Sequence, residues 1–352
     1  VAYGALGPER LWFGNAVLAA AWMAGAPAAS GLAFAGLTRL ASRHTTGDSA
    51  AWLYGANTLG STAGALLGGL VLLPMLEPRI TVGLLAVIVA LPAAALAGRR
   101  WLVAPVVLAL AAWLTPSWDA RLYAVGVHIK VSDFQDPSPD AIARYAAENW
   151  DLLHYDHGLT AAVAVGQSRK TGNVWLSING KFDASTGDDM PTQVLSGEIP
   201  VATAANPRQV AVVGLASGVT AGAALRDPRV ESLRVFELEP AVVDASHFFD
   251  HVNGRPLDDP RTTLILDDAR AQLTRDPRRY DVIISEPSNP WISGISSLFT
   301  QEYWALGRSR LTEGGVFCQW VQLYGMGPEQ FRALVRTYVA VFGDVWLYET
   351  IP

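Results

Sequence analysis

The chain has 352 residues, 51% of them hydrophobic, and a formal net charge of −6 at pH 7. This composition is unusually apolar for one soluble domain and predicts a membrane-embedded part. The acidic balance argues against nucleic acid as a partner, and the lone Cys318 excludes an internal disulfide framework and a cysteine-ligated zinc site. Because the sequence begins with Val1 and not with Met, we expect it to be a fragment of a longer protein.

The first region, residues 1–118, holds only nine charged side chains. Three uncharged stretches within it reach or approach the roughly 20 residues that a helix needs to cross a bilayer. We therefore expect transmembrane helices, in contact with membrane lipid, at 11–38, 50–76 and 80–97. The alternative is a set of buried helices in a large soluble protein, but such helices rarely lack charge for so long.

The side of the membrane on which the rest of the chain lies depends on residues 101–114, an apolar stretch that is short for a span. If this stretch lies in the membrane interface, the C-terminal part is cytoplasmic; if it crosses, that part lies outside. We favour the cytoplasm, because the cofactor that residues 201–352 are predicted to bind is made there. The positive-inside rule puts in the cytoplasm the loops that carry Arg39, Arg43, Arg99 and Arg100.

Residues 119–200 are predicted to form a linker and a small β-domain. The β-rich segments TAAVAVGQ, NVWLSING and KFDAST are separated by the turns SRKTG and NG, which predicts an antiparallel sheet over residues 152–186. In residues 201–352, strands alternate with helices, as in a parallel doubly wound sheet. We expect its strands at QVAVVG, SLRVFELE, TTLILDDA, YDVIISEP and GGVFCQWVQ, with a last one at DVWLYE.

Glycines and acids lie where these predicted strands end. Gly214 and Gly218, in GLASG, predict a turn whose backbone N–H groups face a ligand at a helix N-terminus. Glu237 ends the second strand, where a carboxylate can accept both hydroxyls of a ribose, and Asp268 ends the third, where it can bind an adenine amino group. A bare α/β turn with surface acids is the alternative.

The glycine motif bears on which nucleotide binds, because NAD and S-adenosylmethionine sites share this layout. The sequence GLASGV lacks the second glycine of G-x-G-x-x-G, which leaves less room for a pyrophosphate. The motif therefore favours an adenosyl sulfonium.

From about residue 150 to 345 the sequence resembles the spermidine synthases, the polyamine aminopropyltransferases. The residues 57–74 resemble the membrane part of bacterial forms in which transporter-like helices precede such a domain. The resemblance implies an α/β Rossmann-like domain of the class I methyltransferase type, preceded by a small antiparallel β-domain and N-terminal transmembrane helices. It rests on NGKFDASTGDDMPTQVLSGEIP, VAVVGLASGVTAGAAL, FELEPAVV, LDDA and YDVIISEPSNPWISGISSLFTQEYW, in that order.

The resemblance also implies a transferase of polyamine biosynthesis, in the bacterial inner membrane, that moves an aminopropyl group from decarboxylated S-adenosylmethionine to a small amine. Family members often form homodimers. Gly214 and Gly218 fall in the family's glycine loop, and Glu237 and Asp268 fall on its ribose- and adenine-binding acids. Glu286 falls where the family has its catalytic aspartate.

Several positions depart from the family pattern. Ser217 stands where the family has an acid for the donor's propylamine, and Asn289 stands where it has a second, amine-binding aspartate. A serine removes a like-charge clash with the carboxylate of intact S-adenosylmethionine, so that donor is an alternative. The other family positions for the substrate side fall on Asn179, Gly180, Asp183, Thr192 and Gln193.

The segment YDVIISEPSNPW carries the predicted catalytic acid. Glu286 ends the fourth strand, and ligands bind at the carboxyl ends of strands in such sheets. A carboxylate there can take a proton from the acceptor amine and balance the sulfonium charge. Pro287 and Pro290 stiffen the loop, and Trp291 can wall the site. The alternative role for Glu286 is to satisfy backbone N–H groups at a helix N-terminus.

Three functions remain compatible with these residues. The first is an aminopropyltransferase, the second is a transferase or methyltransferase that uses S-adenosylmethionine on another acceptor, and the third is a non-catalytic nucleotide-sensing domain of a transporter-like protein. Asp188 and Asp189 can attract a cationic substrate, although a solvated turn fits them equally well. No metal is predicted, since His, Asp and Glu show no metal-ligand spacing.

Overall fold

The computed structural model describes residues 48–72, 75–76, 80–81, 83–88, 91, 103–114, 119–124, 126, 139–292 and 294–350. The predicted membrane span at 11–38 lies outside these described residues. Backbone contacts divide the chain into two compact units, Val1–Asp119 with Lys130–Ile142 and Ala120–Ile129 with Ala143–Pro352.

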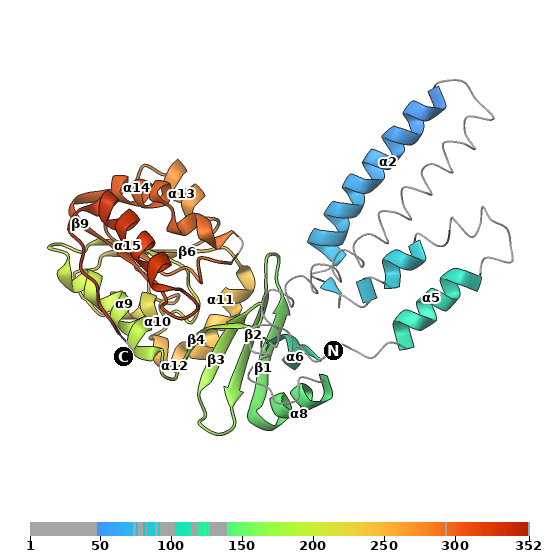
Figure 1. The fold of residues 1–352 in the computed structure, drawn as a ribbon, viewed down its shortest axis with the longest axis horizontal. Helices are drawn as coiled ribbons and strands as arrows, with labels where there is room; N and C mark the ends of the chain where they lie inside the picture. Colours follow the sequence, from blue (N-terminus) through green and yellow to red (C-terminus); the bar gives the residue numbers. More distant parts are fainter. Residues whose placement is uncertain are drawn as a thin grey trace. The chain divides into compact units, whose positions relative to one another are not determined.

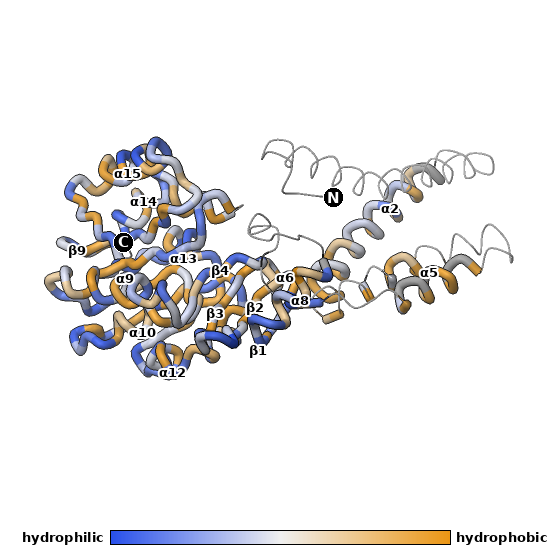
Figure 2. Tube along the Cα trace, turned by 60° about the horizontal axis from the view of Figure 1, so that its bottom comes forward, coloured by the Kyte–Doolittle hydropathy of each residue, from blue (hydrophilic) through white to orange (hydrophobic). Residues whose placement is uncertain are grey.

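The first unit includes the helix α2 (Asp48–Leu67), which continues into the π-helical turn η2 (Gly68–Leu72), and the helix α5 (Val103–Leu114) (Figure 1). The α5 helix is hydrophobic along its length (Figure 2), and it exposes Trp113 and Leu114 at its end. Among the described residues, no helix combines the length and the apolar character needed to cross a membrane.

The second unit contains α6 (Ala120–Ala124), most of α8 (Pro139–Asn149) and a four-stranded antiparallel sheet. Its turn between the third and fourth strands is Asn179–Gly180, and both residues have positive φ (51° and 77°), as a tight two-residue hairpin turn requires. Antiparallel pairing over this region agrees with the expected sheet. Its strands lie in sequence order: β1 (Trp150–His157), β2 (Ala162–Ser168), β3 (Val174–Ile178) and β4 (Lys181–Ser185).

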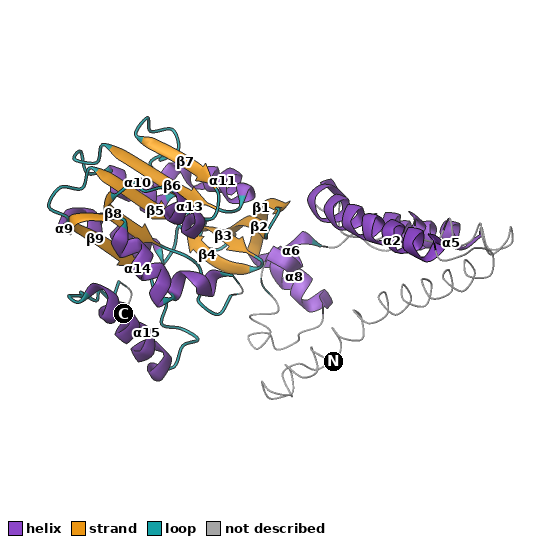
Figure 3. Ribbon diagram, turned by 90° about the horizontal axis from the view of Figure 1, so that it is seen from above, coloured by secondary structure: helices purple, strands orange, loops and turns teal. Residues whose placement is uncertain are grey.

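A five-stranded parallel sheet follows, which confirms the predicted doubly wound arrangement. Its spatial order is β7-β6-β5-β8-β9 (Figure 3), so the direction of winding reverses between β5 and β8. Ligands of open parallel sheets bind where this reversal opens a crevice at the strand ends. The strands are β5 (Gln209–Val213), β6 (Ser232–Glu237), β7 (Thr262–Leu266), β8 (Tyr280–Ser285) and β9 (Leu311–Gln319).

Successive residues of the central strand β5 point to opposite faces of the sheet and enter two different cores. Val210 and Val212 pack with α9, α10 and α11, whereas Ala211 and Val213 pack with α13, α14 and α15. Fully burying an aliphatic or aromatic side chain contributes roughly 1.5–3 kcal/mol. The helices are α9 (Met190–Thr203), α10 (Val219–Leu225), α11 (Pro240–Ser246), α12 (Asp250–Asn253), α13 (Ala269–Arg275), α14 (Gln301–Ser309) and α15 (Pro328–Phe342).

The expectation of a sixth strand at DVWLYE was wrong. Residues 344–349 are irregular, and Trp346 is 81% exposed. The segment has strand-forming residues, but within the described part of the chain it adds no strand beside β9, which ends the sheet next to β8.

The carboxylate of Glu239 ties the antiparallel sheet to the parallel one. It lies at the start of α11 and accepts hydrogen bonds from the backbone N–H of Thr160 (2.6 Å) and Ala161 (3.2 Å) and from the Thr160 hydroxyl (2.8 Å), all in the β1–β2 turn. It also accepts from the N–H of Ala241 (3.2 Å), which makes it the N-cap of α11. Burial raises the pKa of Glu239, but these hydrogen bonds outweigh burial, and the pKa lies below its usual value.

Candidate active site

The loop after β5 brings the chain close to the end of β8. Gly214 has φ 93°, and a Cβ added there would lie 2.9 Å from the backbone oxygen of Glu286. Gly218 has φ 77° and precedes the first turn of α10. Ala216, between them, also has positive φ (45°), a conformation that costs a residue with a Cβ about 1–2 kcal/mol. The glycines are thus required by the backbone, and Ala216 adopts a conformation that glycine would tolerate better.

Glu237 holds this glycine loop in place. One carboxylate oxygen accepts from the N–H of Leu215 (2.9 Å), and the other accepts from the N–H groups of Leu238 (2.8 Å) and Glu239 (2.9 Å). Burial raises the pKa of Glu237 while these three bonds oppose the rise. A carboxylate offers about four lone-pair sites, so one remains for a ligand hydroxyl, not the two that a ribose diol would need.

Asp268 caps the N-terminus of α13, because its carboxylate accepts from the N–H of Ala271 at 2.6 Å. The side chain is exposed at the end of β7, where a base could reach its second oxygen. The glycine loop, Glu237 and Asp268 therefore lie at the ends of three adjacent strands, β5, β6 and β7.

Ser217 and Gln193 are buried against each other. The Ser217 hydroxyl donates to Gln193 Oε1 at 2.5 Å, and Gln193 Nε2 donates to the carbonyl of Ser185 at 2.8 Å. Thr220 Oγ1 donates to the backbone carbonyl of Gln193 at 2.9 Å. These bonds join α9 to the glycine loop, and they leave an uncharged wall where the family has an acid.

Glu286 directly follows β8, and its N–H donates to the carbonyl of Val213 at 3.0 Å. Burial raises the pKa of its side chain to about 7, Thr220 opposes this shift, and the negative charge of Asp189 adds to it. A carboxyl with this pKa can both take and release a proton near neutral pH, as a general base must.

Asp189 and Asp188 have different surroundings although they are adjacent. Asp189 accepts a short hydrogen bond from the Ser185 hydroxyl and lies close enough to Glu286 to affect its ionisation. Asp188 is exposed on the turn before α9. Only Asp189 is therefore brought into the electrostatic environment of Glu286.

The loop after Glu286 presents a second group of side chains. Asn289 is buried, and its amide oxygen lies 3.4 Å from the Tyr324 hydroxyl. Trp291 is 53% exposed and meets the Tyr324 ring edge-on at 6.3 Å between centroids. Asn289 is thus an inner residue of this loop, whereas Trp291 stands at its rim.

Three further residues at this loop were missed from the sequence. Ser288 Oγ donates to Asp183 Oδ1 at 2.6 Å, and Lys181 Nζ lies 2.6 Å from the same oxygen. Lys181 and Asp183 lie close in sequence as a cation and an acid, which was a usable signal, although the register of β3 with β4 shifts at Asp183. Tyr324 gave no such signal because it lies in an irregular segment.

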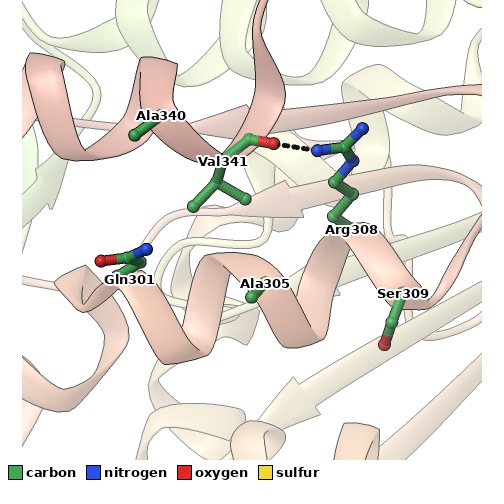
Figure 4. Close-up of a pocket in the computed structure, with 6 residues that line it drawn as sticks. All are labelled: Gln301, Ala305, Arg308, Ser309, Ala340 and Val341. Carbon is green, nitrogen blue, oxygen red and sulfur yellow. Dashed lines mark hydrogen bonds between the residues drawn. The ribbon is translucent and has the colours of Figure 1, made fainter.

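A hollow of about 470 Å³ between α14 and α15 contains none of the predicted site residues (Figure 4). Its Arg308 donates to the backbone carbonyl of Val341, so the guanidinium joins the two helices. The side chains that line this hollow include no carboxylate. The candidate active site is therefore located at the ends of the strands, where Glu286 lies. Among the described residues, no group of three or more His, Cys, Asp or Glu side chains is arranged to hold a metal ion.

The C-terminal part of the chain is similar to known proteins. Residues 193–350 match the family model described as "Spermine/spermidine synthase domain". The chain is 26% identical over 209 residues to spermidine synthase from Dictyostelium discoideum, covering 59% of this chain and 73% of that protein. It is 27% identical over 193 residues to putrescine N-methyltransferase 2 from Nicotiana tabacum, covering 54% of each.

A solved structure, spermidine synthase from Thermotoga maritima, superposes with a TM-score of 0.50 at 20% identity, over 55% of this chain and 65% of that one. This likeness supports the Rossmann-like fold alone. The named relatives are group-transfer enzymes, which confirms the prediction of a transferase. Residues 193–350, which hold the glycine loop, Glu237, Asp268 and Glu286, are thus the part of the chain that is similar to spermine and spermidine synthases.

Proposed function

We propose that the protein transfers an aminopropyl group from decarboxylated S-adenosylmethionine to a small amine, with Glu286 as the general base. The observation that carries this proposal is the location of a partly buried carboxyl, its pKa raised to about 7 by desolvation, beside the glycine loop at the point where the sheet order reverses. The match to a spermine/spermidine synthase family model and the similarity to a spermidine synthase support it further.

The acceptor amine must lose a proton before its nitrogen can attack. In the proposed reaction the Glu286 carboxylate takes that proton, and the nitrogen lone pair forms a bond to the donor's propyl carbon. The bond between this carbon and sulfur breaks, and its electron pair stays on sulfur, which leaves methylthioadenosine. The positive donor also favours the ionised form of Glu286, because opposite charges attract most strongly in a poorly solvated site.

A second candidate is methyl transfer from intact S-adenosylmethionine. Two observations favour it: the uncharged Ser217–Gln193 wall removes an acid that would repel the donor carboxylate, and one matched relative is a putrescine N-methyltransferase.

Product analysis separates these functions. The full chain is incubated with putrescine or another small amine and with each donor, and the nucleotide product is identified by mass spectrometry. Methylthioadenosine supports aminopropyl transfer, and adenosylhomocysteine supports methyl transfer. Donor binding with neither product would favour a nucleotide-sensing domain and refute the enzymatic proposal.

We also propose that the N-terminal region anchors the protein in the bacterial inner membrane, with the catalytic domain in the cytoplasm. The exposed apolar side chains of α2 and α5, such as Trp52, Leu59 and Trp113, support this proposal. Cell fractionation followed by carbonate extraction tests it, since an anchored protein stays in the membrane pellet and a loosely attached one is released.

A further inference from the structure

A buried ion pair lies on the strand β4 beside the loop that carries Glu286. The side chains of Lys181 and Asp183 are 11% and 8% exposed, and Nζ lies 2.6 Å from Oδ1. The register of β3 with β4 shifts here, with Ala184 opposite Leu176 and Phe182 opposite Ser177, so Asp183 is an extra residue of β4. The short distance between Nζ and Oδ1 shows directly that the two side chains meet. Phe182, between them, stacks on Trp175 at 4.7 Å between centroids.

Ser288 fixes the ion pair against the loop. Its hydroxyl donates to Asp183 Oδ1 at 2.6 Å, and Ser288 lies directly between Pro287 and Asn289 in sequence. Asp183 Oδ1 thus has two donors, whereas Oδ2 is buried and has no hydrogen-bond partner among the described residues. Because an unpaired buried carboxylate oxygen is costly, Oδ2 is a position at which a ligand donor would be stabilised.

Gln322 offers a second incomplete polar group at the same end of the sheet. It is 3% exposed, and neither its amide nitrogen nor its amide oxygen has a partner in the described part of the chain. The segment that holds it is attached on both sides to the Glu286 region. Trp320 N–H donates to the Ser285 carbonyl at 2.9 Å, and Tyr324 lies against Asn289 and Trp291.

Charge is distributed unevenly around this loop. Glu286 and the neighbouring Asp189 are acids at one end. At the other end, Lys181 neutralises Asp183, and Asn289 and Gln322 carry no charge. An ammonium is favoured beside Glu286, but a second ammonium beside Asp183 would meet the positive charge of Lys181.

We propose that the acceptor is a monoamine whose far end is an uncharged hydrogen-bonding group, and that Lys181 excludes diamines by occupying the place of their second ammonium. The free Asp183 Oδ2 accepts from the far-end group, and Gln322 can donate to it and accept from it. This proposal rests on the proposed function, since it assigns the acceptor of that same site.

Two acceptors of equal length test the assignment. The full chain is assayed with saturating donor and either putrescine or 4-amino-1-butanol, which differ only in the far-end group, and kcat/KM is compared. We expect the amino alcohol to be preferred at least tenfold. Equal use of the two acceptors, or a preference for putrescine, would overturn the proposal.

Two variants make the region that would hold the far end of the acceptor more negative, one by removing a cation and the other by adding an acid. Lys181→Met frees Asp183, and Asn289→Asp adds an acid while keeping the ion pair, so each should shift the kcat/KM ratio at least tenfold toward putrescine. Lys170→Met, on an exposed turn, is the matched control and should leave the ratio unchanged. If Lys181→Met does not fold, Asn289→Asp alone decides, and an unchanged ratio in a folded variant contradicts the proposal.

Failure of the proposed function has a different signature. If neither acceptor is consumed with either donor, the enzymatic account fails. The amines are then compared by calorimetry with methylthioadenosine present. Tighter binding of 4-amino-1-butanol than of putrescine supports the assigned chemistry of this region, and the reverse order refutes it.

Discussion

The nucleotide side and the acceptor side of the candidate site are built in different ways. On the nucleotide side, Glu237 is held by three backbone N–H groups, and Asp268 caps a helix. On the acceptor side, Asp183 Oδ2 and the Gln322 amide have no hydrogen-bond partner among the described residues. The acids of the first side are therefore held by hydrogen bonds within the fold, whereas the second side keeps polar atoms that have no partner among the described residues. Substitutions should accordingly affect folding on the first side and turnover on the second.

The largest effect is expected at Glu286, on the acceptor side. Glu286→Gln removes the proton acceptor while keeping the size of the side chain, and should lower kcat about 10²- to 10⁴-fold. Donor affinity, measured by calorimetry, should change little because the nucleotide contacts lie elsewhere. A variant that retains more than a tenth of the activity would refute the role of general base.

The pH dependence should also differ between turnover, which needs Glu286, and donor binding, which does not. Because burial raises the pKa of Glu286 to about 7, the carboxyl is protonated below that pH and cannot accept a proton. The kcat/KM should therefore fall as the pH decreases through about 7, and donor binding should fall less steeply. An activity that stays constant from pH 8 down to pH 5 would contradict the assignment.

Glu239 should affect stability instead of turnover. Glu239→Ala leaves the N–H groups of Thr160, Ala161 and Ala241 without their acceptor, so the free energy of unfolding should fall by about 2–4 kcal/mol. Glu231→Ala, which breaks an exposed pair with Arg208, is the control and should change it by less than about 1 kcal/mol. Urea denaturation measures both.

The sign of the pH effect on this contribution follows from the lowered pKa of Glu239. The stabilisation is present above the pKa of the carboxyl in the unfolded chain and is lost as the pH falls through the lower folded pKa. The difference in stability between wild type and Glu239→Ala should therefore shrink in acid. A difference that grows in acid would contradict this reading.

The smallest expected effect is a gain at Ala216, in the glycine loop. Ala216→Gly removes the cost of a Cβ at positive φ, but it also makes the unfolded chain more flexible, so the net gain should be about 0.5 kcal/mol. Ala202→Gly, in the exposed part of α9, should instead cost roughly 0.5–1 kcal/mol. A loss of stability at both positions would refute strain at Ala216.

The sequence predicted the parallel sheet well because Val210 to Val213 and Val282 to Ile284 form uninterrupted apolar runs, which are typical of strands covered on both faces. It predicted a strand at 344–349 wrongly, since strand propensity alone does not decide whether a segment pairs with the edge strand of a sheet. The predicted site residues at the ends of β5, β6, β7 and β8 follow from topology alone.

The partners of those residues could not be foreseen in the same way. The hydrogen bond from Ser288 to Asp183 and the contact of Tyr324 with Asn289 each join segments of different strands or loops. Such contacts depend on how β4 and the segment after β9 pack beside β8, and no local pattern encodes that packing.

Glu237 and Glu239 are separated by a single residue. Glu237 accepts a hydrogen bond from the glycine loop, whereas Glu239 accepts hydrogen bonds from the β1–β2 turn. Leu238 alone separates the two acids, and the N–H of Glu239 donates to the Glu237 carboxylate at 2.9 Å, so the two sets of hydrogen bonds are directly linked. A nucleotide that tightens Glu237 would thereby slow the exchange of the Thr160 and Ala161 amide hydrogens with solvent, far along the chain from any atom it touches. Because Glu237 and Glu239 are so close in sequence, hydrogen exchange in the β1–β2 turn should report whether a nucleotide is bound at Glu237.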